Sequence, residues 1–428
     1  MTNNTLKQQD LQTIWHPCSQ MKDYEHLPLI PIKKGEGVYL EDFDGNRYID
    51  AISSWWVNLF GHSNPYINSK IKEQLDSLEH VIFAGFTHEP AVTLSKRLLK
   101  LTASNLTKVF FADNGSSAIE VALKMAFQYF KNDGEIRDRF VSLKNSYHGE
   151  TLGALAVGDV ELYKDIYDEI ILKTVQAKSP ALVSEEEALE DMKEVLKQNR
   201  GRVSAVIIEP LVQCAGNMAM YDKSYIKKLK KLCEDEGVFL IADEIAVGFG
   251  RTGEMFICDE EIKPDFLCLS KGLTGGYLPL ALVLTTDEVY GKFYCDYSEG
   301  KSFLHSHSYT GNPLACAAAN ATLDIFEKEN IIEKNRVLIK KLQTLMQKFK
   351  KLERVENIRQ RGLIAAFDIK DYDPLKRENL DIYKYALKKG VLLRPLANTV
   401  YFMPPFIMSE DELQRVIEVA FEAIESLK

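Results

Sequence analysis

The sequence predicts an α/β fold: a mostly parallel sheet with crossover helices, joined to a smaller region of mixed helices and strands. Three observations lead to this prediction. Short apolar runs bounded by loop residues alternate with helical patterns at least four times in the middle of the chain, as they do around parallel sheets. Two of these runs, VFLIA and DFLCL, end in polar residues. The chain of 428 residues also exceeds one small core, so two domains are expected.

The N-terminal part contains a predicted β-hairpin over residues 38–50, in which an Asp-Gly turn separates two apolar stretches. Two adjacent tryptophans follow on a predicted loop. Because neighbouring side chains cannot both face one core, we expect Trp56 to pack inside and Trp55 to form a wall of a ligand pocket. Apolar residues at helical spacing then predict helices over residues 66–83 and 89–101.

A possible phosphate-binding cup follows the first predicted strand of the central sheet, residues 109–112. There the sequence Asn-Gly-Ser-Ser, residues 114–117, opens a helix. The first turn of a helix leaves backbone N–H groups free, and the helix dipole favours an anion at that end. Taken alone, the pattern is more simply explained by an ordinary N-cap, with Ser116 or Asn114 satisfying the first turn.

The next predicted strand, residues 140–144, gives way to Tyr147, His148 and Gly149. An aromatic side chain at the end of a strand is suited to lie on a flat cofactor ring. A half-buried turn tyrosine is the alternative for Tyr147. A further buried strand, residues 203–208, also ends in polar residues.

The two apolar runs VFLIA and DFLCL carry the strongest chemical signal. The first leads into Asp243, and the second leads into Ser270 and Lys271. In open α/β sheets, ligands bind beyond the carboxyl ends of the strands. Asp243 could pair with a cationic ring nitrogen, and Lys271 could form a Schiff base, so the pair indicates a pyridoxal phosphate (PLP) enzyme. Most lysines are surface residues, but a lysine in this place is a better nucleophile candidate.

A dinucleotide site is the main alternative, because residues 248–253 fit G-x-G-x-x-G. However, these glycines do not follow the strand directly, and no crossover helix comes after them. They more simply shape a loop beside the active site with Arg251 at its tip. We expect no metal site, because His148, His305 and His307 lack carboxylates at ligand spacing, and no G-x-S-x-G hydrolase motif occurs.

Composition limits the partners and the compartment. A net charge of −9 argues against non-specific nucleic-acid binding. The seven cysteines contain no C-x-x-C pair, which favours a reducing, cytoplasmic location. The first residues are polar, so no signal peptide is expected, and no apolar run is long enough for a membrane span.

The C-terminal part begins with a loop rich in Ser, His and Thr that leads into an alanine-rich helix, followed by a long helix and alternating strands and helices. We place the change of domain near residues 315–330. The predicted large domain is residues 61–320, and residues 1–60 and 321–428 are predicted to form the small α+β domain.

The motifs IIEP, DEIAVGFGRTG, PDFLCLSKGLTGGYLP and GNPLACAAA resemble the class III, PLP-dependent aminotransferases of fold type I over nearly the whole chain. The resemblance implies a large domain with a mostly parallel, seven-stranded sheet flanked by helices, and a small α+β domain formed by both ends of the chain. Within the family, IWHP, SSWW, HVIFAGFTHEPAV and YFMPPF resemble the subfamily that aminates 7-keto-8-aminopelargonate in biotin synthesis. S-adenosylmethionine is the usual amino donor of that subfamily.

The resemblance also implies roles for matching positions. Lys271 would bind PLP covalently and shuttle the proton, and Asp243 would pair with the pyridinium nitrogen. The other implied cofactor contacts are the ring-face residues Tyr147 and Ile245 and the phosphate contacts Gly115, Ser116, His307 and Ser308. His307 and Ser308 would come from the neighbouring subunit, which implies a homodimer. The implied substrate contacts are Trp55, Tyr147, Lys271, Ser306 and Arg394. A guanidinium such as that of Arg394 is suited to a bidentate grip on a carboxylate.

Three departures from the subfamily pattern bear on the substrates. Cys18 stands where the subfamily often has tyrosine, Glu150 where it often has aspartate, and Ser306 where glycine is common. Cys18 and Glu150 fall in the substrate-facing part of the pattern, and we count them with Arg251 among the substrate contacts. Lysine as the amino donor therefore stays open, as does another class III ω-aminotransferase activity.

Overall fold

The computed structural model describes residues 2–427, which pack into two compact units. One unit is formed by the residues up to Pro65 together with those from Glu333 onward, and the other is Tyr66–Ile332. Each unit is described by itself below. The domain boundaries predicted near residues 60 and 320 stay a prediction.

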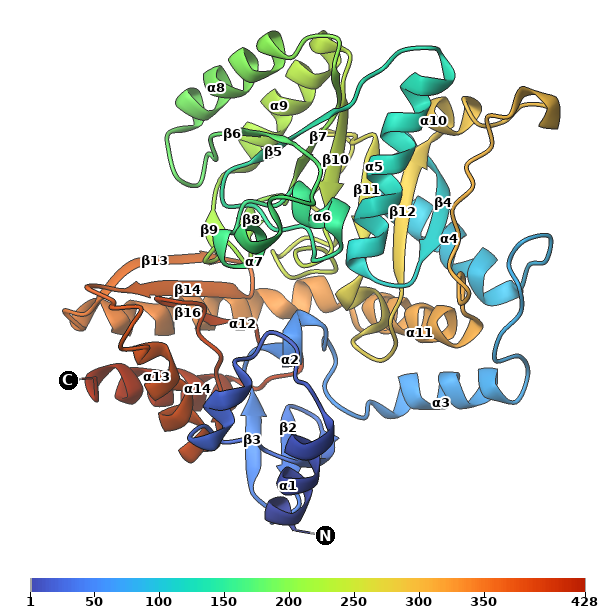
Figure 1. Ribbon diagram of the computed structural model, residues 1–428. Coiled ribbons are helices and arrows are strands. Elements are labelled where there is room, and N and C mark those ends of the chain that lie inside the picture. Colours follow the sequence, from blue (N-terminus) through green and yellow to red (C-terminus); the bar gives the residue numbers. More distant parts are fainter. Residues whose placement is uncertain (1, 428) are drawn as a thin grey trace. The chain divides into compact units, whose positions relative to one another are not determined.

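A seven-stranded sheet forms the centre of the larger unit, with the strand order β4-β12-β11-β10-β7-β5-β6 (Figure 1). Only β12 is paired antiparallel to its neighbours. The strands are β4 (Leu106–Ala112), β5 (Arg139–Leu143), β6 (Val175–Ala177), β7 (Val203–Ile208), β10 (Phe239–Asp243), β11 (Phe266–Leu269) and β12 (Ala281–Thr286). The predicted mostly parallel, seven-stranded sheet is confirmed.

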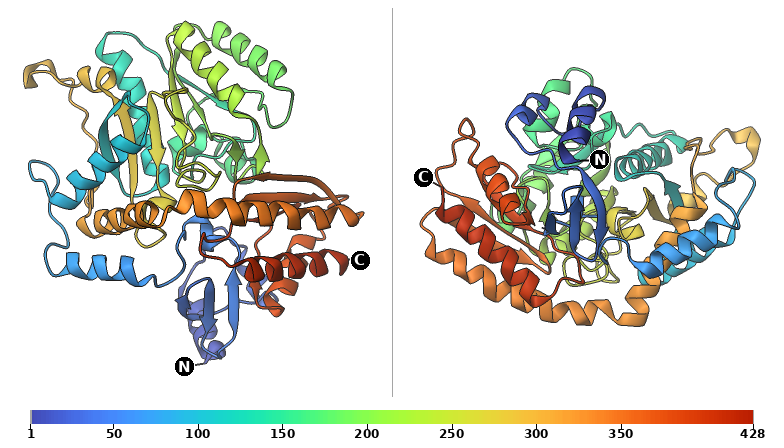
Figure 2. Two further views of the ribbon diagram at one scale, coloured as in Figure 1. Left: turned by 180° about the vertical axis from the view of Figure 1, so that it is seen from behind. Right: turned by 90° about the horizontal axis from the view of Figure 1, so that it is seen from below.

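Helices cover both faces of this sheet, as the opposed views of Figures 1 and 2 show. Helix α5 contacts five of the strands on one face, while α4 packs on β4 and on α11. The helices are α3 (Pro65–Leu75), α4 (Glu89–Leu101), α5 (Gly115–Asn132), α6 (Leu152–Ala156), α7 (Glu161–Lys164), α8 (Glu185–Gln198), α9 (Lys223–Glu236), α10 (Asp287–Gly291) and α11 (Pro313–Glu329). A short ribbon of β8 (Val212–Gln213) and β9 (Ala219–Met220) completes the unit.

The core of the larger unit follows from its apolar runs. Every residue of β7, β10 and β11 is buried, as expected for strands covered on both faces. Helix α5 buries one side against them, including Ile119 and Ala122. Because β4, β5, β7, β10 and β11 all run in the same direction, their carboxyl ends meet at one edge of the sheet.

The smaller unit contains a four-stranded sheet of order β1-β2-β3-β15 and a three-stranded sheet of order β13-β14-β16. The predicted hairpin of residues 38–50 is confirmed as the antiparallel pair β2–β3. The elements are β1 (Ile32–Glu36), β2 (Tyr39–Asp42), β3 (Arg47–Asp50), β13 (Val355–Arg361), β14 (Ile364–Ile369), β15 (Val391–Leu392), β16 (Thr399–Phe402), α1 (Asn3–Thr13), α2 (Ser53–Trp56), α12 (Ile331–Met346), α13 (Glu378–Lys388) and α14 (Glu410–Glu425).

One predicted helix is shorter than expected. The prediction of residues 66–83 is wrong at its C-terminal end, because α3 ends at Leu75 and the chain then runs as a loop to α4. In that loop the ring of Phe83 packs 5.5 Å from Phe111 and 5.3 Å from His88. The ring of Phe83 thus packs on β4, outside α3. Within residues 2–427, no helix has both the length and the apolar character that crossing a membrane requires.

Candidate active site

Asp243 and Lys271 lie at the carboxyl ends of two neighbouring parallel strands. Asp243 is the last residue of β10 and is paired in register with Cys268 of β11. Lys271 comes three residues after Cys268 and begins a short 3₁₀ turn. Its backbone has a φ of 43°, a conformation that costs a non-glycine residue free energy and is concentrated at functional sites. The two residues are therefore brought to the same sheet edge, as the sequence predicted.

The Asp243 carboxylate is buried and fixed at both oxygens. Its Oδ2 lies 2.7 Å from Nδ1 of His148, and its Oδ1 accepts the backbone N–H of Ile245 at 3.1 Å. His148 is itself 2% exposed, and its Nε2 has no hydrogen-bond partner within residues 2–427. The sequence indicates His148 only as a metal candidate and does not predict its position beside Asp243. The adjacent Tyr-His-Gly at a strand end was the available signal.

The amine of Lys271 has a pKa below that of an ordinary lysine. Burial lowers the pKa of Lys271, while the nearby negative charge of Asp243 opposes this effect, as do Cys214 and Glu209. A lowered lysine pKa increases the fraction of neutral amine, which is the nucleophilic form. The surroundings therefore suit Lys271 to attack a carbonyl carbon.

The Glu209 carboxylate forms hydrogen bonds with two loops, one at Tyr147 and the other at Cys214. Its Oε2 accepts the N–H of Tyr147 at 2.9 Å, and its Oε1 accepts the N–H of Cys214 at the same distance. Burial raises the pKa of Glu209 to about 7, while the neighbouring His148 opposes this effect. Glu209 is the first of the polar residues that follow the predicted strand 203–208, but the sequence predicts no role for it, because its partner Tyr147 is distant in the chain.

The side chain of Tyr147 is half-buried, and its hydroxyl lies 2.9 Å from Oε1 of Glu150. Its ring stands edge-on to Tyr163, with 5.6 Å between the ring centroids. Glu150 also donates its backbone N–H to Oγ of Ser116 at 3.2 Å. The structure thus links the predicted ring-stacking residue to the predicted phosphate cup through Glu150.

The predicted phosphate cup is the N-terminus of α5. Asn114 caps the helix by accepting the N–H of Ser117 at 3.0 Å. Two glycines allow close packing around it. A Cβ on Gly115 would lie 3.1 Å from the Ile245 side chain, and a Cβ on Gly149 would lie 2.1 Å from Oγ of Ser116. The remaining N–H groups of the first turn point at a site suited to an anion.

The glycine-rich loop 248–253 follows β10. Glu244 accepts the N–H groups of Ile257 at 2.9 Å and of Cys258 at 2.7 Å, which closes the loop at its base. Arg251, predicted at the tip of this loop, is 1% exposed. Its side chain is therefore buried within the unit.

The loop that precedes α11 carries the residues predicted to reach a neighbouring subunit. His307 is half-buried, while Ser306 and Ser308 are exposed. Nε2 of His307 lies 3.2 Å from Nε2 of His305, whose Nδ1 lies 2.9 Å from Nζ of Lys124. Among residues 2–427, no cluster of His, Cys, Asp and Glu has a geometry that could hold a metal ion.

Three predicted substrate contacts lie in the smaller unit and are close to one another. The guanidinium carbon of Arg394 lies 4.6 Å from the ring centroid of Trp55. Nη2 of Arg394 donates to the carbonyl oxygen of Cys18 at 3.3 Å. All three residues are exposed. Trp56, by contrast, is 4% exposed and packs edge-on to Tyr401.

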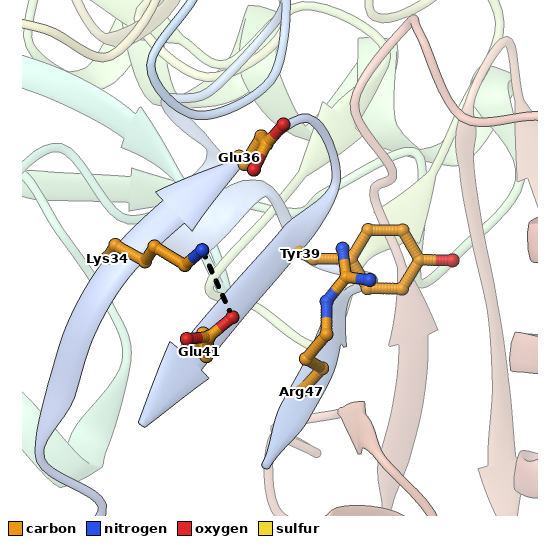
Figure 3. A pocket seen from close by; sticks show the side chains of 5 residues that line it. All are labelled: Lys34, Glu36, Tyr39, Glu41 and Arg47. Carbon is orange, nitrogen blue, oxygen red and sulfur yellow. Dashed lines mark ion pairs between the residues drawn. The ribbon is translucent and has the colours of Figure 1, made fainter. Parts of the chain in front are cut away.

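The smaller unit also has a shallow pocket on its four-stranded sheet, shown in Figure 3. Its lining residues are Lys34, Glu36, Tyr39, Glu41 and Arg47. Lys34 pairs with Glu41 at 3.3 Å, and the guanidinium of Arg47 lies over the Tyr39 ring. None of the predicted site residues is among them, so this pocket is no candidate for the active site.

The larger unit fits PLP in three respects. A buried carboxylate, Asp243, has acceptor capacity for a protonated ring nitrogen. A lysine of lowered pKa, Lys271, follows the neighbouring strand. The N-terminus of α5 can hold a phosphate. Such a set can bind the cofactor covalently and exchange amino groups on it.

Comparisons with known proteins agree with this chemistry. Residues 20–424 match the family described as aminotransferase class-III. A Helicobacter pylori protein named adenosylmethionine-8-amino-7-oxononanoate aminotransferase is 51% identical over 98% of this chain and 97% of its own length. The crystal structure of the Methanocaldococcus jannaschii protein of the same name superposes with a TM-score of 0.96 and 40% identity, covering 99% of both chains. An amine transaminase from an uncultivated Pseudomonas species, solved in a PLP-bound form, reaches 0.91 at 30% identity, covering 96% of this chain and 98% of its own.

Proposed function

Since this chain belongs to the class III aminotransferase family, we propose that it aminates 8-amino-7-oxononanoate (7-keto-8-aminopelargonate) to 7,8-diaminopelargonate in biotin synthesis. The chain is a PLP-dependent aminotransferase of fold type I. The observation that carries the choice of acceptor is the 51% identity, over nearly the full length, to a relative named for that reaction.

PLP, when bound, supplies an aldehyde that exchanges amino groups and a ring that withdraws electrons. Within the larger unit, we assign Asp243 to hold a proton on the ring nitrogen, with His148 orienting its carboxylate. Nζ of Lys271 would bind the cofactor and move the proton at the amine-bearing carbon of the substrate. Its lowered pKa suits it to both tasks.

The remaining cofactor contacts follow the same proposal. Tyr147 and Ile245 would lie on the two faces of the ring, and Gly115 and Ser116 would bind the phosphate at the N-terminus of α5. The tie between Glu209 and the backbone of Tyr147 would hold the aromatic residue in place.

The substrate contacts are assigned residue by residue. Arg394 would bind the carboxylate of the keto acid, and Trp55 would offer it an apolar surface. Cys18, Arg251 and Ser306 complete the proposed set, and Glu150 belongs to it as well. A carboxylate such as that of Glu150 favours a positively charged amino donor, a property that S-adenosylmethionine and lysine share. We propose S-adenosylmethionine as the donor, as in the names of the relatives.

We further propose that the enzyme is a homodimer in which His307 and Ser308 contact the cofactor phosphate of the neighbouring subunit. Large apolar side chains support this proposal, since Phe86 is 62% and Leu304 88% exposed. We propose the cytoplasm as its location. None of the seven cysteines is in a disulfide, which suits a reducing compartment.

Half-reactions of the purified holoenzyme test the donor. S-adenosylmethionine alone is expected to change the absorbance of the bound cofactor, and subsequent addition of 8-amino-7-oxononanoate is expected to restore it. A response to lysine and not to S-adenosylmethionine would reassign the donor. If neither amine changes the spectrum, or if the keto acid fails to restore it, the proposed reaction is wrong.

Replacement of Lys271 tests the cofactor assignment. Lys271→Ala is expected to lose the absorbance of lysine-bound PLP and to lower kcat by a factor of about 10³ or more. Lys144→Ala is the matched control, since Lys144 follows β5 at the same sheet edge but is exposed. Unchanged absorbance in Lys271→Ala would contradict the role of this lysine.

A further inference from the structure

The turn that carries Trp55 has an unusual backbone. Ser53, Ser54 and Trp56 have φ angles of 52°, 61° and 66°. Residues other than glycine seldom adopt this left-handed region, and three of them within four positions persist only when their surroundings hold them. The segment labelled α2 is therefore a strained turn and not a regular helix. Something outside the turn has to stabilise it.

Asp50 provides that stabilisation. Its side chain is fully buried at the end of β3. Oδ1 accepts the backbone N–H of Ser54 at 2.8 Å, and Oδ2 accepts the Ser54 hydroxyl at 2.9 Å. A buried carboxylate that accepts both groups of one residue fixes that residue's backbone as well as its side chain.

His62 in turn fixes the Asp50 carboxylate. Nε2 of His62 lies 3.0 Å from Oδ2 of Asp50. The backbone of His62 is paired with that of Gly37, through hydrogen bonds of 2.7 Å and 3.1 Å. A Cβ on Gly35 would lie 2.6 Å from Cβ of His62. The hairpin β1–β2 thus leaves the imidazole little freedom to move away from Asp50.

The flanks of the turn are anchored separately. The hydroxyl of Ser53 donates to the carbonyl oxygen of Met403 at 2.8 Å, and Nε1 of Trp56 donates to the hydroxyl of Tyr401 at 3.1 Å. Trp55, between them, is 43% exposed and lies beneath the guanidinium of Arg394. The strained turn therefore buries the side chain of Trp56 and leaves that of Trp55 exposed.

We propose that Asp50, oriented by His62, is a positioning residue for substrate binding: it holds the Ser53–Trp56 turn in the conformation that presents the Trp55 ring beneath Arg394. This inference rests on the proposed function in that Trp55 and Arg394 are taken as substrate contacts. Asp50 itself is buried and acts through the turn. A site whose contact residues are fixed before binding loses less conformational entropy when the substrate arrives.

The kinetic test compares two buried aspartates of the same sheet. Asp50→Ala is expected to raise KM for the keto acid about tenfold or more, because a small displacement of a contact residue is costly, while kcat and PLP absorbance change little. Asp42 is the matched control: it is 1% exposed and accepts the N–H groups of Asp44 and Asn46 in the β2–β3 turn. Asp42→Ala is expected to lower stability without changing KM.

A double-mutant cycle with Trp55 separates positioning from general destabilisation. If Asp50 acts through Trp55, Asp50→Ala raises KM in the natural protein but adds nothing to the effect of Trp55→Ala. Equal effects of Asp50→Ala in both backgrounds overturn the proposal, and so does an equal KM effect of Asp42→Ala. Asp50→Asn is expected to rescue part of the loss, because its amide oxygen can still accept the N–H of Ser54 and its amide nitrogen can donate to the Ser54 hydroxyl.

A fluorescence measurement tests the same inference without any substrate. In a Trp15→Phe background the remaining tryptophans are Trp55 and the buried Trp56. Asp50→Ala is expected to shift the emission and iodide quenching of Trp55, while Asp42→Ala leaves them unchanged. No shift with Asp50→Ala overturns the inference, whereas a protein that shows the shift but does not aminate the keto acid contradicts only the proposed function. If Asp50→Ala does not fold, Ser54→Ala, which removes one of the two hydrogen bonds, is expected to shift both readouts in the same direction.

Discussion

Gly149 lies where the larger unit has no room for a side chain. Its φ is 128°, and a Cβ there would lie 2.1 Å from Oγ of Ser116. That oxygen also accepts the N–H of Glu150. Any side chain at this position would push apart the loop after β5 and the N-terminus of α5. Glycine is therefore required for both the backbone conformation and the close approach.

Gly149→Ala is expected to weaken PLP binding about tenfold or more, because the proposed phosphate contact at Ser116 has to move. A titration of the apoenzyme with PLP measures this. Gly134→Ala is the matched control, since Gly134 also has a positive φ, of 82°, but open space around its Cβ position. It is expected to lower stability by about 1 kcal/mol and to leave PLP affinity unchanged. Equal PLP affinities in the two variants would contradict the assigned cup.

Single residues also show which parts of the site a sequence can reveal. Asp243 and Lys271 were predictable because each follows a buried strand, and parallel strands bring their ends together. The hydrogen bonds of Glu209 and His148 could not be predicted, because their partners follow other strands. The bond from Tyr147 to Glu209 spans 62 positions and that from His148 to Asp243 spans 95. No local pattern encodes such a pairing.

At the scale of elements, the loop after β10 depends on one buried carboxylate. Glu244 is fully buried and accepts N–H groups from Ile257 and Cys258. Burial raises the pKa of Glu244 to about 7, against its ordinary value of 4.5. Since the folded protein binds this proton more tightly than the unfolded chain, the stability linked to it is fully present below 4.5 and is lost as the pH rises through 7.

Glu244→Gln is therefore expected to flatten the pH dependence of stability. Between pH 5 and 8 the natural protein should lose roughly 1–3 kcal/mol relative to the variant, whatever the variant's absolute stability. Denaturant unfolding at several pH values measures the difference. Glu254→Gln, on the exposed part of the same loop, is the control and should follow the natural protein. A constant difference between Glu244→Gln and the natural protein across this range would refute the expectation.

The α3 segment shows why helix boundaries are harder to predict than the sheet. Leu78, Val81 and Ile82 continue the apolar spacing of the helix, yet the helix ends at Leu75. Phe83 packs on Phe111 instead. Periodicity reports that residues are apolar at helical spacing, but the partner that buries them decides the backbone. The sheet strands were predictable because their burial on both faces leaves short, uniformly apolar runs.

At the scale of the whole molecule, exposed apolar groups indicate where a second chain would pack. The segments 79–86 and 297–312 are adjacent, since the rings of His80 and Tyr309 are 5.2 Å apart and Nδ2 of Asn312 reaches the carbonyl of Glu79. Tyr297 is 97% exposed, on the same segment as His307. The homodimer is a proposal that rests on the family resemblance, and these exposed groups lie on the surface that it would use.

Subunit complementation tests this arrangement. Lys271→Ala and His307→Ala subunits should each be nearly inactive at limiting PLP. If His307 serves the neighbouring site, a heterodimer contains one intact site and one doubly altered site. An equal co-expression of both should therefore recover about a quarter of the natural activity, because about half of the dimers are mixed. Sedimentation analysis would measure whether the chain is a dimer, and an absence of recovery would place His307 in its own subunit's site.

Cys18 gives the smaller unit a built-in chemical probe. It is the exposed thiol of the seven cysteines, five of which are buried and one of intermediate burial. Its carbonyl oxygen accepts from Arg394, so the backbone of Cys18 contacts the residue assigned to the substrate carboxylate. A maleimide reagent should modify Cys18 first, and its rate of modification should fall as the keto acid binds. Occupancy could then be followed by mass spectrometry on the natural protein, with no turnover and no engineered label.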